Sequence, residues 1–523
     1  MALNFKRPFL ENLKKNELIV LFFCLFIGFV LRVYTLDYKS LWIDEIHTFN
    51  DSRYGLKDQI QYYKENPTYF QAPLFFILTH LFYPFSKPER ELRILPLIFG
   101  ALSIPMFYFL ARLFSPAIAL PCALSLTFMT YHISLSQEAR AYTLLMFLGM
   151  AGLYFLMRHL QTFQRRYLVP GAFCFALLFY TSYSSMPFMI FSQLLWFYKI
   201  NKETRTPSFS SFLIFNGLIF IFCAPWILFL AFNYKGQWMP QLFEMKVIIS
   251  LWEIVYGILN DWVPHAPLMI SSSIFLILAP FLSVEKKNIL ILLSIFSLPV
   301  IGMFAFCKLM NITHFITSRY FIGFLPIFLI LVYRSTHTIE FKLKINRKWM
   351  SLTTLFLVLF IGSHLMILPL YYQSEKQDFR RLVAYLKVNL REGDQIFDAD
   401  RMLIGILHYF RVPPSGRYYI LDDWKVSKEE AEYRKSFLYQ NKTITIYHSI
   451  NCCDRYLTEG HRLWIVAGGI NAKRLIESTP SVLKGYFDGS FLNFERFPVD
   501  ASLYLLLWDP QSPHERGIDL PNQ

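Results

Sequence analysis

The sequence predicts a mainly α-helical membrane protein that crosses the bilayer many times and ends in a small α/β domain outside it. Hydrophobic residues make up 54% and aromatic residues 18% of the 523 residues. This content exceeds what the surface of a soluble protein tolerates. Long apolar runs recur up to about residue 370, and only short runs follow. These observations separate a membrane domain, 1–371, from an external α/β domain, 372–523.

A transmembrane helix needs roughly 20 apolar residues, and this requirement yields about eleven spans. They are expected at residues 17–36, 92–114, 116–136, 140–160, 167–184, 186–200, 209–231, 266–283, 288–307, 319–335 and 349–370. The apolar stretch Leu74–Phe85 reaches only about 18 Å as a helix, which is too short to cross. We expect it to lie in the membrane interface.

The positive charge of the chain is distributed as in membrane proteins. The net charge is +14, but Lys and Arg gather in short clusters between apolar runs. Such clusters are typical of cytoplasmic loops, so we set nucleic-acid binding aside. With a cytoplasmic N-terminus every inside loop is basic. The external side then carries the loop 37–91, the loop 232–265 and everything after residue 371.

The external domain shows short strand-like runs that alternate with helical patterns. Strands are expected at 395–397, 418–421, 443–447, 463–466 and 503–508, and helices at 377–390, 427–438 and 472–477. Gly468-Gly469 lacks the third glycine of a dinucleotide fingerprint, so we interpret it as a turn.

Two adjacent carboxylates, Asp44 and Glu45, directly follow the first apolar run. An ionisable pair is expensive to keep beside lipid, so a functional site facing water or a protein cavity is its default interpretation. The alternative is an acidic helix start that caps a juxtamembrane helix.

Three short motifs lie on the predicted external side of the membrane. They are Ser40–Glu45 after the first span, Gln71–Phe76 at the interfacial segment with Arg93 beyond it, and Ser136–Tyr142 at an external junction of two spans. Together they resemble the GT-C membrane glycosyltransferases, in the branch of the protein O-mannosyltransferases and the lipid A aminoarabinose transferases. A later stretch with His314, Ser318–Phe321 and Pro326 is similar to the same branch, as is the external α/β domain.

The resemblance implies an enzyme that takes a hexose or pentose from a polyprenyl-phosphate donor. It implies transfer with inversion to an envelope lipid, polysaccharide or protein at the outer side of the membrane. The implied location is the inner (plasma) membrane, with the C-terminal domain in the periplasm. We expect that domain to cover the site or select the acceptor.

The residues suit this chemistry. An acceptor loses a proton as it attacks the anomeric carbon, and Asp44 is our candidate base. Glu45 cannot share a helical face with Asp44, so we expect it to orient the acceptor, hold a basic partner or help bind a metal. The leaving lipid phosphate needs positive charge, which arginine supplies in bidentate form. The candidate substrate-binding residues are Arg140 and Arg319, followed by Lys308, His314, Tyr142, Tyr320 and Trp42.

Several alternatives stay open at this point. A divalent metal held by Asp44, Glu45 and His47 is one, although these groups are too few to establish a site. Arg140 pairing with Glu138 is another. The rival functions are a transporter or flippase and a polymerase of lipid-linked sugars. Transporters keep ionisable groups near the bilayer midplane on broken helices, whereas the candidates here sit at external ends of spans.

Overall fold

The structure, a computed structural model, divides into two compact units. It describes residues 15–67, 70–198, 208–235, 250–283, 285–309, 317–342, 351–400, 402–412, 432–449, 460–489 and 501–511. The helical unit comprises Met1–Tyr34, Gln59–Leu81 and Arg93–Pro369. The mixed unit comprises Thr35–Asp58, Phe82–Leu92 and Leu370–Gln523. The predicted boundary at 371 assigned the whole loop 37–91 to the membrane domain, whereas residues 35–58 and 82–92 cluster with the C-terminal part.

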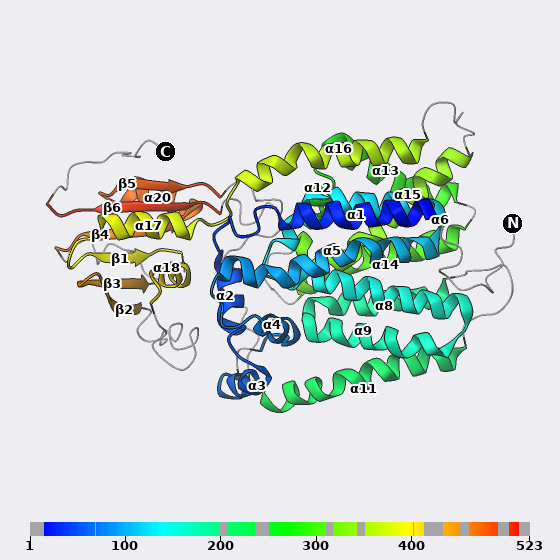
Figure 1. Cartoon of the computed structure of the whole chain (residues 1–523), viewed down its shortest axis with the longest axis horizontal. Helices are drawn as coiled ribbons and strands as arrows, with labels where there is room; N and C mark the ends of the chain where they lie inside the picture. The colour runs from blue at the N-terminus through cyan, green and yellow to red at the C-terminus, as the bar shows by residue number, and fades with distance from the viewer. Residues whose placement is uncertain are drawn as a thin grey trace. The chain divides into compact units, whose positions relative to one another are not determined.

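Among the described residues, 7 helices are long and apolar enough to cross a membrane. They are α1 (Lys15–Val33), α5 (Pro88–Phe114), α8 (Tyr142–Thr162), α11 (Phe209–Asn233), α14 (Lys286–Leu309), α15 (Leu325–Lys342) joined to the 3-10 helix η6 (Ser318–Phe324), and α16 (Leu352–Gln373). Two bent pairs raise the count to 9: α6 (Pro116–Phe128) with α7 (Thr130–Ser136), and α12 (Leu251–Trp262) with α13 (Ala266–Leu282). Figure 1 shows the long helices running side by side.

The membrane fold class is confirmed, but two of the eleven predicted spans are shorter than a full crossing. The stretch 167–184 contains α9 (Leu168–Thr181) of 14 residues, which reaches about 21 Å. It ends because Ser182 turns to extended backbone, with φ −165°. The stretch 186–200 contains α10 (Met186–Ser192) and the 3-10 helix η4 (Gln193–Phe197). The predicted interfacial segment contains α4 (Leu74–His80), whose 7 residues are indeed too few to cross.

The bend of 60° between α6 and α7 interrupts the helical hydrogen bonds at Met129. In a continuous helix the Thr130 N–H would donate to the Leu126 carbonyl. Instead it donates to Nδ1 of His364 at 3.3 Å, and the Leu126 carbonyl accepts from Arg32 at 2.9 Å. Both halves of the lost bond thus have partners inside the protein, as hydrocarbon surroundings require.

Arg32 is fully buried near the end of α1 and uses its remaining donors on the same bend. Its Nε donates to Ser136 Oγ at 3.2 Å, and a terminal nitrogen donates to His132 Nδ1 at 2.8 Å. The Gln137 side chain then donates to the Arg32 carbonyl at 3.0 Å. The guanidinium therefore holds α7, and the Arg32 carbonyl holds the loop that follows it.

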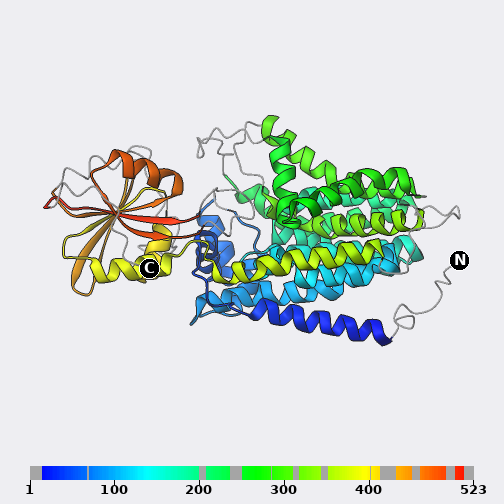
Figure 2. The same cartoon turned by 90° about the horizontal axis from the view of Figure 1, so that it is seen from above.

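The mixed unit contains a six-stranded sheet in the order β2-β3-β1-β4-β6-β5. The strands are β1 (Gln395–Asp398), β2 (Glu432–Tyr439), β3 (Lys442–Ser449), β4 (Leu463–Gly468), β5 (Val482–Phe487) and β6 (Leu503–Trp508). β1 is parallel to β3 and β4, and the other pairs are antiparallel. Figures 1 and 2 show α17 (Phe379–Asn389) and α20 (Gly469–Ser478) on opposite faces of the sheet. The helix α18 (Leu403–Phe410) follows β1.

Most predicted elements of this sheet are confirmed. Strands lie at 395–398, 442–449, 463–468 and 503–508, and helices at 379–389 and 469–478. The expected strand 418–421 lies outside the described residues. The predicted helix 427–438 is wrong from residue 432 onward, because β2 pairs with β3 in a hairpin. Gln440 and Asn441 turn that hairpin with φ of 48° and 62°, the left-handed pair that a tight two-residue loop requires.

Replacing Arg32 tests the importance of the α6–α7 bend. Arg32→Ala leaves the buried Leu126 carbonyl and its neighbours without their donor, at roughly 1–3 kcal/mol for each group. We expect a clearly lower melting temperature in detergent and partial recovery with Arg32→Lys. Arg165→Ala is the control, because Arg165 is exposed. An Arg32→Ala protein as heat-stable as this control would contradict the assignment.

Candidate functional site

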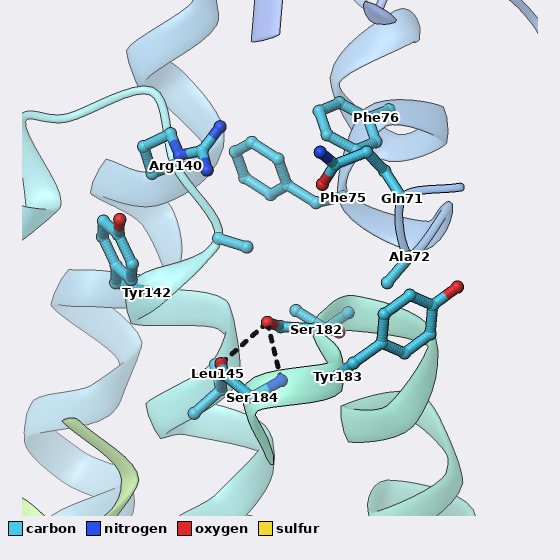
Figure 3. A pocket seen from close by; sticks show the side chains of 12 residues that line it. Gln71, Ala72, Phe75, Phe76, Arg140, Tyr142, Leu145, Ser182, Tyr183 and Ser184 are labelled. Carbon is cyan, nitrogen blue, oxygen red and sulfur yellow. Dashed lines mark hydrogen bonds between the residues drawn. The ribbon is translucent and has the colours of Figure 1, made fainter. Parts of the chain in front are cut away.

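A cavity of about 220 Å³ lies in the helical unit, where three segments distant in sequence meet. It is lined by Gln71, Ala72, Phe75 and Phe76, by Arg140, Ala141, Tyr142 and Leu145, and by Thr181, Ser182, Tyr183 and Ser184. Figure 3 shows Arg140 and Tyr142 on one side, Gln71 and Phe75 across from them, and Ser182 and Ser184 below. The volume is below the roughly 300–1,000 Å³ typical of ligand clefts, so it suits one small group.

The first wall comes from the residues before α4 and from its first turn. Pro73 precedes the helix and its carbonyl accepts from the Ile77 N–H at 3.1 Å. Phe75 and Phe76 are buried and form an apolar side of the cavity. Gln71 adds an amide, which both donates and accepts hydrogen bonds.

The second wall is the start of α8, which carries the cavity's charge. Arg140 precedes the helix and is the one charged side chain among the described residues that line the cavity. The Thr143 hydroxyl in the first turn donates to the Pro96 carbonyl at 2.8 Å, which ties α8 to α5. The N-terminus of a helix of 21 residues adds partial positive charge beside Arg140. This wall therefore favours an anion.

The third wall is a group of hydroxyls after α9. Ser182 Oγ accepts from the Ser184 N–H at 3.3 Å and lies 2.8 Å from Ser184 Oγ. The Tyr183 hydroxyl accepts from the Trp226 indole N–H at 2.8 Å. We did not single out this wall from the sequence. The signal was present as the run Thr181-Ser182-Tyr183-Ser184-Ser185 between two apolar stretches.

Two of the three sequence motifs thus line one cavity. The motif Gln71–Phe76 contributes Gln71 and Ala72, among others, and the motif Ser136–Tyr142 contributes Arg140 and Tyr142. The remaining motif, Ser40–Glu45, holds the acidic pair and belongs to the mixed unit.

The other predicted phosphate ligands do not line this cavity. Arg319 is the second residue of η6 and donates from Nε to Thr317 Oγ1 at 3.2 Å, with its guanidinium 6.0 Å from the Tyr320 ring centre. Lys308 is exposed at the end of α14, 5.1 Å from the Phe304 ring centre, as an interfacial anchor would be. His314 lies outside the described residues.

A buried polar cluster that the sequence did not suggest lies beside Arg319. Ser318 Oγ donates to the Asp261 carboxylate at 2.6 Å and lies 2.7 Å from the Tyr131 hydroxyl. Asp261 is buried at the end of α12, next to the 113° bend. The cluster joins three helical segments of the helical unit.

The acidic pair begins the helix α2 (Ile43–Asp51) in the mixed unit. Glu45 is 1% exposed, and its carboxylate accepts from the Trp42 N–H at 3.4 Å. Asp44 is only half-buried. The two carboxylates thus differ in environment, as adjacent positions on a helix predict. Glu45 stabilises the start of the helix, and Asp44 is the more accessible group.

The sequence left open a metal held by Asp44, Glu45 and His47. Among the residues that the structure describes, no group of three or more His, Cys, Asp or Glu side chains is arranged to hold a metal ion. Asp44, Glu45 and His47 are all described and do not form such a group.

Glu375, in the same unit, has an unusual environment. Its pKa is raised to about 7, mainly by burial and also by the neighbouring Asp378, while Lys39 and Arg380 oppose the shift. Its Oε2 accepts from the Ser40 N–H at 3.1 Å. The folded protein therefore holds a proton on Glu375 at pH values where the unfolded chain has released it.

This shift predicts a pH-dependent stability. Between the ordinary pKa of 4.5 and about 7 the folded state binds more protons, so the contribution of Glu375 falls as pH rises through that window. Glu375→Gln removes the titration. We expect the melting temperature of Glu375→Gln minus that of wild type to increase from about pH 5 to about pH 8. Glu477→Gln, at an exposed position on α20, is the control. A difference from wild type that is constant with pH would contradict the shift.

The fold and the cavity define a class of polytopic membrane protein with a small α/β sheet. A solved structure with this fold is ArnT from Cupriavidus metallidurans in the apo state: TM-score 0.53, 10% identity, 95% of this chain and 98% of that chain covered. The same ArnT bound to undecaprenyl phosphate matches with TM-score 0.51 and 11% identity, over 96% of this chain and 100% of that chain. No protein-family model and no curated protein sequence matches the chain. The resemblance expected from the motifs is confirmed at the level of the fold.

Proposed function

We propose that the protein is an integral-membrane glycosyltransferase that moves a sugar from a polyprenyl-phosphate donor to an envelope acceptor. The observation that carries the proposal is the cavity that two motif segments line, with Arg140 at the N-terminus of α8. A guanidinium and a helix N-terminus together suit a phosphate. The likeness to ArnT, one structure of which holds undecaprenyl phosphate, supports the same donor class.

The transfer needs a base and a leaving group. The acceptor oxygen or nitrogen attacks the anomeric carbon, the bond from that carbon to the phosphate oxygen breaks, and polyprenyl phosphate leaves with the electron pair. The acceptor proton passes to a carboxylate, for which we propose Asp44. Attack opposite the leaving phosphate inverts the anomeric centre. Arg140 balances the charge that develops on the phosphate.

The lining of the cavity suits the donor phosphate. The described lining residues offer one cation, an amide and several hydroxyls, but no carboxylate. The donor sugar is proposed to be a hexose or pentose, and the acceptor an envelope lipid, polysaccharide or protein.

The alternative function, a transporter, is less well supported than the glycosyltransferase. Transporters use broken helices whose free ends coordinate substrate or ions. At the break between α6 and α7 the Leu126 carbonyl and the Thr130 N–H are bonded to Arg32 and His364 instead. The break is thus closed by the protein's own side chains. We place the enzyme in the inner membrane with a cytoplasmic N-terminus, from the distribution of basic residues.

Asp44→Asn tests the proposed base. The amide cannot accept the acceptor's proton, so we expect transfer to fall by at least about 100-fold, the lower end of what a positioned base contributes. Mass spectrometry of envelope lipids, polysaccharides and proteins measures transfer in cells that carry only the variant. Asp58→Asn, at an exposed site on the next helix, α3 (Leu56–Glu65), is the control. Full activity of Asp44→Asn at normal protein levels would overturn the assignment.

Arg140→Gln tests the phosphate site. The variant keeps a side chain of similar length but removes the charge, so we expect about tenfold or more weaker binding of undecaprenyl phosphate, from the loss of a charge-assisted bond. Binding is measured on the purified protein in nanodiscs. Arg90→Ala, at an exposed arginine, is the control. Unchanged affinity in Arg140→Gln would remove the cavity from the donor site.

A further inference from the structure

The five residues that lead into the acidic pair, Lys39–Ile43, lie in the mixed unit; we name them the entry segment. Ser40–Trp42 adopt no regular secondary structure. Their backbone N–H groups therefore need partners that neither a helix nor a strand supplies. Ser40 and Leu41 are nevertheless buried.

Side chains more than 300 residues later in the sequence supply these partners. Ser40 N–H donates to Glu375 Oε2 at 3.1 Å, Leu41 N–H to the Tyr409 hydroxyl at 2.8 Å, and Ile43 N–H to Gln377 Oε1 at 3.1 Å. Each acceptor comes from the part of the mixed unit that also carries the sheet. Amides at three of the five positions are thus held from outside the entry segment.

The Tyr409 hydroxyl is at the centre of this arrangement. It accepts from Leu41 N–H and from Ser40 Oγ at 3.1 Å, and it donates to Glu89 Oε1 at 3.1 Å. A phenol has one donor and two acceptor sites, so its capacity is used in full. Burial raises the pKa of Tyr409, which keeps the donated proton in place. Arg380 pairs with the same Glu89 oxygen at 3.2 Å.

Two contacts of side chains complete the arrangement. The Lys376 ammonium lies 3.6 Å from the centre of the Trp42 ring. The Lys39 ammonium donates to the Tyr371 carbonyl at 2.6 Å. Trp42, which we had considered as a sugar contact, therefore has a protein partner on its ring face.

We propose that Glu375, Gln377 and Tyr409 are positioning residues that aim Asp44 by fixing the backbone of the entry segment. The inference rests on the proposed role of Asp44 as the base. Ile43 is the first residue of α2 and Asp44 the second, so the direction of the Asp44 side chain follows from the backbone that these three residues hold. A misplacement of about 1 Å at a reacting group costs on the order of 100-fold in rate.

The proposal changes the role expected of the C-terminal domain. A domain that only covered the site or selected the acceptor would be dispensable for the geometry of the base. A domain that holds the entry segment is required for catalysis with any acceptor. We expect donor binding in the cavity of the helical unit to be unchanged when the entry segment is released.

Tyr409→Phe in the full-length protein is the test. The variant keeps the ring but leaves the Leu41 N–H without its acceptor. We expect faster hydrogen exchange at the amides of the entry segment, sugar transfer lowered about 10- to 100-fold, and unchanged binding of undecaprenyl phosphate. Tyr439→Phe is the matched control, because the Tyr439 ring packs on Phe410 in the same unit, 5.4 Å between centroids.

Glu375 provides a second, independent pair of variants. Glu375→Gln keeps an oxygen that accepts from Ser40 N–H, whereas Glu375→Ala removes it. We expect near-normal transfer and exchange with Gln and a loss of transfer with Ala. This rescue by the conservative variant distinguishes positioning from a general loss of folding.

The outcomes separate this inference from the proposed function. Slow exchange and full transfer in Tyr409→Phe, with Asp44→Asn inactive, would overturn the positioning role and leave the base intact. Fully active Asp44→Asn would overturn the base itself, whatever Tyr409→Phe does. Loss of undecaprenyl phosphate binding in Tyr409→Phe would also contradict the inference, because the variant would then act on the donor.

Discussion

The buried guanidinium of Arg32 is the interaction on which the geometry of the helical unit depends. A bend of 60° in a membrane helix separates backbone donors from acceptors, and hydrocarbon offers them no water. Arg32 satisfies the Leu126 carbonyl, and His364 satisfies the Thr130 N–H. A charged side chain in this position is expensive unless all its donors are used, and those of Arg32 bond to five oxygen and nitrogen atoms.

The bend is followed by α7 and by the loop that leads to the cavity. Gln137 follows α7 and bonds to the Arg32 carbonyl, and Arg140 lies three residues further on. The loop then delivers Arg140 to the start of α8, where the helix N-terminus adds to its charge. The bonds of Arg32 and the charged wall of the cavity thus lie on one continuous segment, α7 and the loop before α8.

The sequence predicted the parts of this structure that depend on local pattern. Apolar runs located the membrane helices, and alternation located β1, β3, β4 and β6. It misjudged β2, because the pairing of that strand is decided by the hairpin partner and not by its own pattern. In the candidate site, the sequence predicted Arg140 as a substrate-binding residue, because its charge stands out. It did not predict the wall of hydroxyls at Ser182. Hydroxyls carry no distinctive spacing, so only the fold reveals which of them face a cavity.

The acidic pair shows what burial adds to a division of labour expected from the sequence. The sequence suggested Asp44 as the base and Glu45 as the orienting group. In the structure Glu45 is enclosed and bonded to the Trp42 N–H, while Asp44 keeps access to solvent. A buried, hydrogen-bonded carboxylate stabilises a helix start, whereas proton transfer requires one that substrate can reach. The helix that bears them is held by side chains from the far end of the chain. No local pattern encodes that dependence, because its partners are distant in sequence and meet only when the mixed unit has folded.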